Sequence, residues 1–576
     1  MKLRYIKHIV PAAALLLAGA GISSCTGDLD VTPIDPGTQM VVDEVALYTK
    51  CYANMALAGN SGADGDCDID GLDGGTTGFV RQLWNANELT TDEAICAWGD
   101  PGIPDFNLNT WGASHPMLQG FYYRLYAGIN YCNHYLELCE GVDATRTAEV
   151  RFLRALYYYY LMDCYGNVPF ATALSAESPS QIQRADLFAW IEGELLSIKG
   201  QLLPPAARNS ATPGYGRADQ DAANLLLARM YLNAEVYTGT AQWEKAKEYA
   251  EKIITGHKHD LWTGSSNGWT SYQMLFMGDN GENGAAQECI LPVMQDGITT
   301  TSYGTTMFLM CSTWKSDMDL SQYKIMLKAI DGTDSIGGDG NNYKIEWLAT
   351  KAYGADTTAV WNCSYGTTEF WSGNRARADL VRKFFPTGTV LQDNIYNTYK
   401  AAGDDRALFF GIDRTLEISA PGKFAEGYSV GKFRNTYASG GNPHDSKFVD
   451  ADFFLMRSAE AYLIAAEADA RINKGVVTNV GKGYIDMLRK RAHAAVGASL
   501  YTLDEILDER ARELYFEGFR RTDLIRFGKF GGNNNYNWEW KGGAQEGTNF
   551  EATRNLFALP SEDVNANPKL VQNPGY

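Results

Sequence analysis

The stretch AANLLLARMYLNA at residues 222–234, followed by WEKAKEYAEKII at residues 243–254, carries the pattern that decides the fold. Apolar residues recur every three or four positions in both segments, which predicts two amphipathic helices. Alanines occupy several of these positions, and Tyr231 and Tyr249 lie between them. Because small side chains allow helix axes to approach closely, we expect the two segments to pack as an antiparallel pair.

The same arrangement of small and aromatic residues recurs near the end of the chain, at residues 459–468 and 484–492. Helix pairs built in this way are typical of tetratricopeptide units. The distances between the copies are irregular, so a regular repeat array is not expected. We predict a mostly α fold, a tetratricopeptide-like helical scaffold of about four helix pairs with large loop-rich insertions. Plain helix pairs remain the alternative.

The helical patterns fall into two blocks, at residues 117–255 and 450–530. The segments at 59–115 and 256–449 are rich in Gly, Trp and polar residues, which predicts loops and short strands. A length of 576 residues would allow about three or four domains. We instead predict a single domain at residues 41–576, in which the loop-rich segments are insertions into the helical scaffold.

The net charge and the aromatic content indicate which classes of partner the protein can bind. The formal net charge is −19. An acidic surface repels nucleic acid and anionic lipid, so neither is expected as a partner. The chain also contains 13 Trp, 33 Tyr and 24 Phe residues. This abundance favours recognition of flat, weakly polar ligands, although a core also absorbs aromatic side chains.

Residues 1–24 have the features of a bacterial signal peptide. Three basic residues precede an apolar stretch at 9–20 that is too short to span a bilayer. The sequence ISSC at 22–25 resembles a lipobox, which predicts lipid attachment at Cys25 and an extended tether at 25–40. An ordinary signal peptide with a nearby cysteine is the alternative. Because two or more acyl chains bind a membrane stably, the lipid alone would anchor the protein.

Several motifs resemble those of one known family. They are EVRFLRAL at 149–156, YGNVPF at 165–170, ERARELYFEGFRRTDLIRFG at 509–528, ALP at 558–560 and QNPGY at 572–576. These stretches are similar to the RagB/SusD family of lipid-anchored glycan-binding proteins of Bacteroidetes. The resemblance extends over nearly the whole chain. It implies a tetratricopeptide-like scaffold, no catalysis, no required cofactor, and a place on the cell surface capping a SusC-like TonB-dependent transporter of the outer membrane.

The resemblance also implies a ligand site. In starch-binding members of the family, an arc of two Trp and one Tyr follows a helical glucan, assisted by an Asp and an Arg. The matching positions here are Trp98, Tyr303 and Trp371, with Asp73 and Arg81. The chemistry is consistent, because the C–H face of a pyranose stacks on aromatic rings while its hydroxyl edge needs charged partners.

The chain departs from the starch-binding pattern at the edge of this arc. Cys96 stands where a further Trp is found, and Pro101 stands where a binding Asn is found. The segment at 312–370 is longer and adds Trp314, Trp347 and Trp361. A starch-type α-glucan is the first expectation for the ligand. A fructan such as levan, or another glycan, is the alternative.

A structural calcium ion is a further expectation, since some relatives hold one. Asp279 and Glu288 lie in one acidic segment, and Asp450 and Asp452 lie in another. Carboxylate oxygens are the ligands that calcium prefers, and an ion bound by both segments would hold the insertion against the scaffold. A solvated acidic loop explains the same residues.

Two other classes of function remain open. A secreted glycoside hydrolase would need two carboxylates flanking a cleft, for which Asp73 with Asp68 or Glu93 could be proposed. A peptide-binding adaptor would use the helical groove. The carboxylates of the 505–517 segment are interleaved with arginines, with Asp508–Arg512 and Glu517–Arg521 spaced as helical ion pairs. Ion-paired carboxylates are ionised, which is unsuited to a general acid, so we do not expect catalysis by this segment. The resemblance to the family implies that the protein is not an enzyme.

Overall fold

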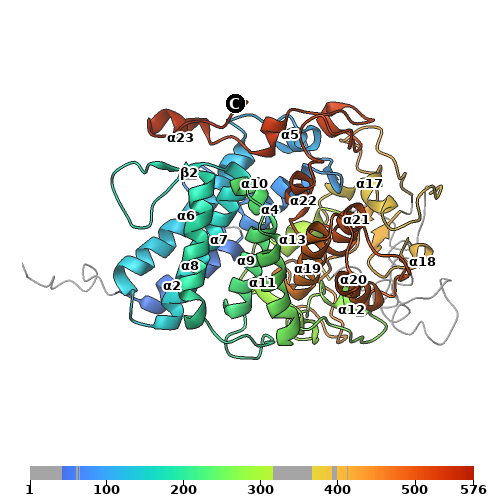
Figure 1. Ribbon diagram of the computed structural model, residues 1–576, viewed down its shortest axis with the longest axis horizontal. Helices are drawn as coiled ribbons and strands as arrows, with labels where there is room; N and C mark the ends of the chain where they lie inside the picture. Colours follow the sequence, from blue (N-terminus) through green and yellow to red (C-terminus); the bar gives the residue numbers. More distant parts are fainter. Residues whose placement is uncertain are drawn as a thin grey trace, which may run out of the picture. The chain divides into compact units, whose positions relative to one another are not determined.

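A series of helices that pack one against the next forms the scaffold (Figure 1). The structure, a computed structural model, describes residues 42–576 except 60–61, 64, 66, 316–365, 392–397 and 412. The predicted pair at 222–254 is confirmed as α9 (Gln220–Leu232) and α11 (Trp243–Gly256), which pack together. Alanines 222, 223, 246 and 250 within this pair are fully buried, as expected for a close helix crossing.

The two predicted helical blocks join into one array. In the first block α6 (Pro116–Cys139) packs on α7 (Ala144–Tyr165), and α7 packs on α8 (Arg184–Ile198). The array continues through α9 and α11 into the second block because α11 packs against α19 (Ser458–Ile472). Helix α19 in turn contacts the last two long helices, α20 (Asn479–Arg491) and α21 (Leu503–Leu514). The mostly α fold is thus confirmed.

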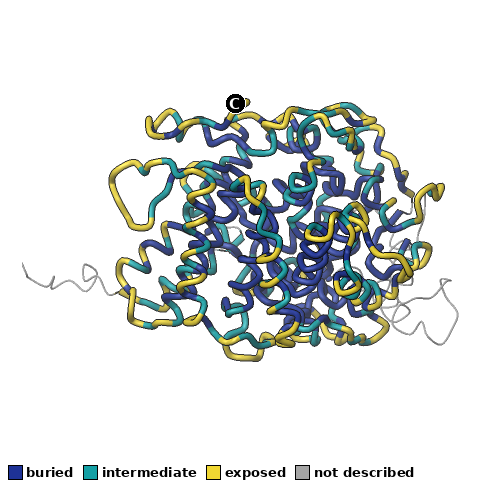
Figure 2. The backbone as a smooth tube through the Cα atoms, viewed as in Figure 1, coloured by how far each residue is buried: buried dark blue, intermediate teal, exposed yellow. Residues whose placement is uncertain are grey.

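Buried residues concentrate along the central helices of the array (Figure 2). Nearly every residue of α7, α9 and α19 is buried, whereas the ends of the helices and their connections are exposed. Local capping fixes several helix starts. The Asp143 side chain accepts a hydrogen bond from the N–H of Arg146 at the start of α7, and Asp219 does the same for α9. Thr502 and Glu505 form a capping box at the start of α21.

The described residues contain four antiparallel two-stranded sheets, one of which ties the 256–449 insertion to the helical scaffold. Strand β4 (Cys289–Val293) pairs with β8 (Phe453–Arg457), which leads directly into α19. Strand β1 (Ala94–Cys96) pairs with β5 (Asn374–Ala376), so that residues about 280 positions apart in sequence lie side by side. The two remaining sheets pair β2 (Val168–Pro169) with β3 (Gln181–Ile182), and β6 (Phe409–Phe410) with β7 (Ser429–Val430).

Eleven further helices complete the helical structure of the described residues. They are α2 (Glu44–Ala56), α5 (Ile103–Leu108), α10 (Ala234–Thr238), α12 (Ser271–Met274), α17 (Ala378–Arg382), α18 (Thr398–Ala402), α22 (Arg520–Arg526) and α23 (Ser561–Ala566), together with α3, α4 and α13, which belong to the site below. Single turns of 3₁₀ helix occur at 199–201, 285–287, 541–543 and 552–555. The secondary structure outside the array is therefore short and irregular, as the composition predicts.

A buried carboxyl pair joins the 85–93 segment to the C-terminal motif. The π-helix Asn85–Leu89 carries Glu88, whose Oε1 accepts hydrogen bonds from the backbone N–H of Gly518 (2.5 Å) and Phe519 (2.9 Å). Glu93 accepts from the N–H of Phe516 at 3.3 Å, and its carboxyl interacts with that of Glu88. Burial raises the pKa of Glu88 to about 7, and burial together with Glu88 raises the pKa of Glu93 well above its usual range.

The ion pairs of the C-terminal motif differ from those expected from spacing. Helix α21 ends at Leu514 and α22 begins at Arg520, so Glu517 and Arg521 do not share a helix. Glu517 instead pairs with Arg457 at 2.7 Å, and Arg521 pairs with Asp163 at 3.2 Å. The predicted Glu517–Arg521 pair is therefore wrong.

The second predicted pair is also absent, although its residues do lie on one helix. Asp508 pairs with Lys383 at 3.2 Å, and Arg512 pairs with Glu509 at 2.8 Å, one turn back along α21. Burial opposes ionisation of Glu509, but Arg406 and Arg512 lower its pKa to about 2. This carboxylate is thus ionised, in agreement with the expectation for the segment.

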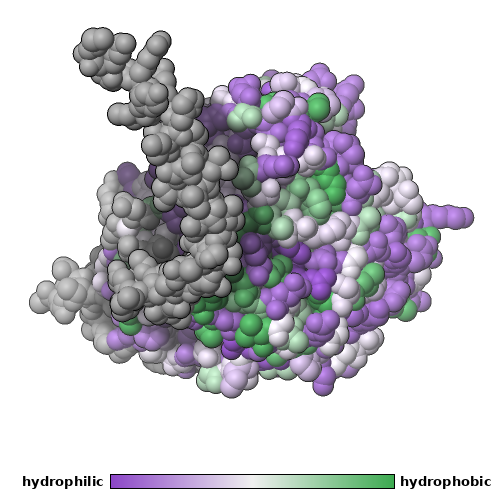
Figure 3. Space-filling model, turned by 90° about the vertical axis from the view of Figure 1, so that its left-hand side faces the viewer, coloured by the Kyte–Doolittle hydropathy of each residue, from purple (hydrophilic) through white to green (hydrophobic). Residues whose placement is uncertain are grey.

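The described residues were compared with the requirements for a membrane-spanning helix. No helix there has both the length and the apolar character required to cross a bilayer. Figure 3 shows one face, on which polar and apolar side chains are interspersed. Exposed large apolar residues such as Val142, Leu174 and Leu196 occur singly along the chain. The predicted signal peptide, tether and Cys25 lie outside the described residues.

Candidate functional site

Two short helices hold the predicted acid and arginine. Asp73 precedes α3 (Gly74–Thr77), and its side chain accepts a hydrogen bond from the N–H of Thr76 at 2.9 Å. Arg81 lies in α4 (Phe79–Trp84). A Cβ placed on Gly75 would lie 2.7 Å from Nη1 of Arg81 and 3.0 Å from Oδ1 of Asp73. The carboxylate and the guanidinium therefore face the same small space, which exists because residue 75 has no side chain.

The guanidinium of Arg81 lies over two aromatic rings. Its central carbon is 5.5 Å from the ring centroid of Trp98 and 5.1 Å from that of Phe308 in α13 (Thr306–Cys311). The Nε atom has no hydrogen-bond partner among the described residues. Burial lowers the pKa of Arg81, while Cys96, Asp100 and Asp73 oppose this change. The cation is thus held by aromatic contacts rather than by a direct ion pair.

The pairing of β1 with β5 places Trp98 beside Trp371. The ladder continues past the strands, since the N–H of Ala97 donates to the carbonyl of Gly373 at 3.0 Å. The indole Nε1 of Trp98 then donates to the carbonyl of Trp371 at 2.7 Å. A Cβ on Gly373 would lie 2.3 Å from the Trp98 ring, so glycine is required for this close approach.

Tyr303 completes the predicted group. Its ring centroid is 6.0 Å from that of Trp371, with the ring planes at 65°. The backbone N–H of Arg81 donates to the carbonyl of Gly304 at 2.9 Å, which ties the Tyr303 loop to α4. Trp98, Tyr303 and Trp371 are all partly exposed. We call these three rings the aromatic platform; Asp73 and Arg81 lie beside it, so the structure brings all five predicted residues together.

Three side chains that contact the aromatic platform were not predicted from the sequence. Glu369 Oε2 accepts a hydrogen bond from the indole Nε1 of Trp371 at 3.0 Å. The ring of Phe448 lies 5.6 Å from that of Tyr303, and Nζ of Lys447 lies 4.9 Å from the Tyr303 centroid. These residues come from two polar loops whose sequences have no distinctive pattern. The one available signal is that Glu369 lies two positions before the predicted Trp371 in the sequence.

A pocket of about 280 Å³ opens beside Asp73 and Tyr303. Its walls are mostly glycine, alanine and small polar residues from the 58–75 and 301–304 segments. The volume is close to the lower end for small-molecule sites, which are about 300–1,000 Å³. One ring of the platform, that of Tyr303, therefore borders a small hollow.

Cys96 and Pro101 are the two positions at which the chain departs from the starch-binding pattern. Cys96 is buried and its N–H donates to the Asn107 side chain at 2.9 Å, whereas Pro101 is exposed. Trp314, expected in the neighbourhood, is 1% exposed and belongs to the core. Trp347 and Trp361 lie outside the described residues.

The carboxylates that a hydrolase would need are engaged elsewhere. Asp68 pairs with Arg124 at 2.7 Å and with Lys50 at 3.1 Å. Glu93 is 1% exposed and belongs to the pair with Glu88 described above. A sealed or ion-paired carboxylate is poorly placed to transfer a proton to a bound ligand. The geometry therefore gives Asp73 no partner acid among the candidates.

The four carboxylates expected to bind calcium all accept hydrogen bonds from protein donors: Asp279 from Ala438 and Ser439, Glu288 from Arg457 and Arg491, Asp450 from Gly297 and His444, and Asp452 from Tyr215 and Gln295. Among the described residues, no three His, Cys, Asp or Glu side chains are arranged to hold a metal ion. Calcium binding stays a prediction.

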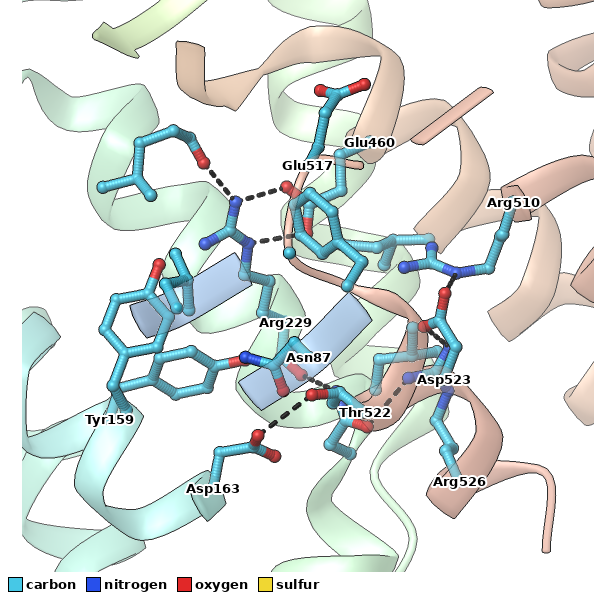
Figure 4. A pocket seen from close by; sticks show the side chains of 18 residues that line it. Asn87, Tyr159, Asp163, Arg229, Glu460, Arg510, Glu517, Thr522, Asp523 and Arg526 are labelled. Carbon is cyan, nitrogen blue, oxygen red and sulfur yellow. Dashed lines mark hydrogen bonds and ion pairs between the residues drawn. The ribbon is translucent and has the colours of Figure 1, made fainter. Parts of the chain in front are cut away.

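The C-terminal motif surrounds a second, much smaller cavity (Figure 4). It has a volume of about 20 Å³, enough for a single water molecule. Arg229 pairs with Glu460 at 2.6 Å, and Arg510 pairs with Asp523 at 2.7 Å. Figure 4 shows these pairs facing inward from separate helices. This part of the motif is a buried structural network.

Comparison with known sequences identifies relatives over the full chain. The model of the SusD family matches residues 322–576. The starch-binding protein SusD of Bacteroides thetaiotaomicron is 36% identical over 614 residues, covering 100% of both chains. SusD-like protein P2 of Formosa agariphila is 24% identical over 513 residues, covering 83% of this chain and 85% of that protein.

Solved structures share the fold. A SusD superfamily protein from Parabacteroides distasonis aligns with a TM-score of 0.61 at 19% identity, over 92% of this chain and 98% of that one. Surface glycan-binding protein A from Bacteroides uniformis aligns with a TM-score of 0.59 at 18% identity, over 92% and 98% of the two chains. With one relative 36% identical along its entire length, this chain belongs to the SusD family.

Proposed function

We propose that this protein captures an oligo- or polysaccharide at the cell surface and delivers it to a SusC-like TonB-dependent transporter. The observation that carries the proposal is the aromatic platform, which stands partly exposed beside Asp73 and Arg81. Aromatic rings stack on the apolar faces of sugars, and the carboxylate and guanidinium can bind the hydroxyl edges. Because the rings, the acid and the arginine lie together, both kinds of contact can be made by one ligand.

A starch-type α-glucan is the first candidate ligand. The 36%-identical relative is named as a starch-binding protein, and the Trp, Tyr, Asp and Arg side chains expected for such a ligand lie together here. A fructan such as levan, or another glycan, is the second candidate. The buried Cys96 and the exposed Pro101 support that alternative, because neither offers the contacts expected at the rim of a starch site.

The protein binds its ligand without cleaving it. No required cofactor enters this proposal, and the candidate acids of a hydrolase are paired or sealed away from Asp73. Incubation of the purified protein with α-glucans, fructans and mucin glycans should release no new reducing ends. Robust release would establish a glycoside hydrolase instead.

Calorimetry against the same glycan panel tests the ligand assignment. Trp98→Ala and Trp371→Ala should each weaken binding of the preferred glycan about tenfold, since each removes a stacking surface. Trp243→Ala, which removes a partly exposed indole at the start of α11, is the matched control and should bind as the wild type does. Equal affinity of all three variants and the wild type would contradict binding at the platform.

The anchor and the transporter are tested in cells. Cys25→Ser should move the protein from the outer-membrane fraction to the soluble fraction, because lipid on Cys25 is proposed as the only anchor. Trp98→Ala should still co-purify with the transporter while binding glycan weakly. Loss of both properties together would contradict separate surfaces for ligand and transporter.

A further inference from the structure

Two successive hydrogen bonds hold the tryptophans of the aromatic platform. Glu369 Oε2 accepts from the Nε1 of Trp371 at 3.0 Å, and the Trp371 carbonyl accepts from the Nε1 of Trp98 at 2.7 Å. Both indole N–H groups are therefore satisfied within the protein. A ligand meets these rings through their faces and not through their N–H groups.

The backbone around Glu369 is fixed by a neighbouring loop. The N–H of Thr368 donates to the carbonyl of Ser446 at 2.9 Å, and the hydroxyl of Thr367 donates to the carbonyl of Lys447 at 2.7 Å. The N–H of Glu369 donates to the Thr367 hydroxyl at 3.3 Å. The next residue of this loop, Phe448, packs against Tyr303. The carboxylate is thus presented to Trp371 by the same segments that support the rest of the platform.

The indole of Trp371 packs partly against the hydrophobic core and partly faces outward. Rotation of an indole about its outer side-chain torsion meets only a broad, shallow energy profile. Its ring contact with Tyr303 is an edge contact at 6.0 Å, and the ring is partly exposed. The hydrogen bond to Glu369 is directional, and it is made with one particular orientation of the indole N–H.

We propose that Glu369 is a positioning residue, which fixes the ring plane of Trp371 and thereby sets the affinity of the platform for its ligand. The effect on affinity rests on the proposed glycan-binding function, whereas the effect on the ring does not. The role depends on the acceptor oxygen of residue 369 and not on its charge.

Two substitutions separate acceptor from charge. Glu369→Gln retains a side-chain carbonyl that can accept the indole N–H, so its glycan affinity should stay within about twofold of the wild type. Glu369→Ala removes the acceptor and should weaken binding about tenfold by calorimetry, the order expected for a lost hydrogen bond. Wild-type affinity in the Ala variant would overturn the proposal. Equal weakening in both variants would also overturn it, because the carboxylate would then act directly on the ligand.

A ligand-free measurement tests the ring itself. Glu369→Ala should change the near-ultraviolet circular dichroism of the free protein, and the change should vanish when both proteins carry Trp371→Phe. Glu369→Gln should leave the spectrum close to that of the wild type. If the wild type binds no glycan while these spectra behave as expected, the proposed function fails and the positioning role stands. If the Ala spectrum is unchanged, the positioning role fails whatever the protein binds.

Discussion

The buried pair of Glu88 and Glu93 predicts a stability that depends on pH. Glu88 is fully buried, and its Oε2 has no hydrogen-bond donor among the described residues. A proton shared with Glu93 explains how two carboxyls can lie together in the interior. The N–H groups of Phe519 and Gly518 and the charge of Lys432 do not prevent burial from raising the pKa of Glu88 to about 7.

The sign and size of the effect follow from this raised pKa. In the unfolded chain Glu88 ionises near pH 4.5, but in the folded protein it keeps its proton until about pH 7. The folded state therefore binds more protons between these values, so the free energy of unfolding falls as the pH rises through this window. The full cost, about 3 kcal/mol, is present above pH 7 and absent below pH 4.5.

Glu88→Gln removes this ionisation while keeping an oxygen acceptor for the N–H groups of Gly518 and Phe519. The difference in stability between variant and wild type should shift in favour of the variant by about 3 kcal/mol between pH 4.5 and pH 8. For a chain of this size the shift corresponds to roughly 3 °C in Tm. Thermal unfolding followed by intrinsic fluorescence at several pH values measures it.

A surface carboxylate provides the control for this measurement. Glu546 is exposed, and Glu546→Gln removes one negative charge without touching the pair. Its Tm difference from the wild type should be nearly the same at pH 5 and pH 8. If the Glu88→Gln difference is also constant across this range, the buried pair is not protonated as described and the reasoning is refuted.

Three further predictions concern the site and its support. Gly373→Ala would place a methyl group against the Trp98 ring; we expect weaker glycan binding by calorimetry and a loss of about 1–3 kcal/mol in stability, and unchanged binding would argue against the close packing. Arg81→Met keeps the bulk of the side chain but removes the guanidinium; glycan affinity should fall about tenfold with Tm nearly unchanged, whereas wild-type affinity would remove Arg81 from the site. Nε and Nη2 of Arg520 donate to the two carboxylate oxygens of buried Asp92 at 2.7 and 2.8 Å. Arg520→Met leaves this carboxylate without its bidentate partner, so Tm should fall by roughly 3–5 °C; a Tm equal to that of the wild type would show that the pair is not needed.

The helical scaffold could be predicted from sequence because its signal is local. Small and aromatic residues at helical spacing identify α9, α11 and α19 without knowledge of their partners. The ion pairs could not be predicted in the same way. Spacing places Asp508 and Arg512 within reach of each other, but Arg512 turns to Glu509 and Asp508 to Lys383, because tertiary neighbours compete with helical ones.

The candidate site was only partly predictable for a related reason. Trp98 and Trp371 meet through strands of three residues that lie about 280 positions apart, too short and too distant for periodicity to pair them. Their assignment came from a resemblance to known proteins, and the structure brings them together. Glu369 and Lys447 occupy loops in which nothing distinguishes them from solvated charges until the fold places them beside the rings.

The packing of α11 against α19 has a consequence for how this protein can diversify. The chain leaves one helix, makes a long excursion that includes Tyr303, Glu369 and Trp371, and returns to the other. Lengthening such an excursion costs little free energy, since the entropy of closing a loop grows only with the logarithm of its length. New binding loops can therefore be inserted between α11 and α19 without a change in the packing of the helical scaffold.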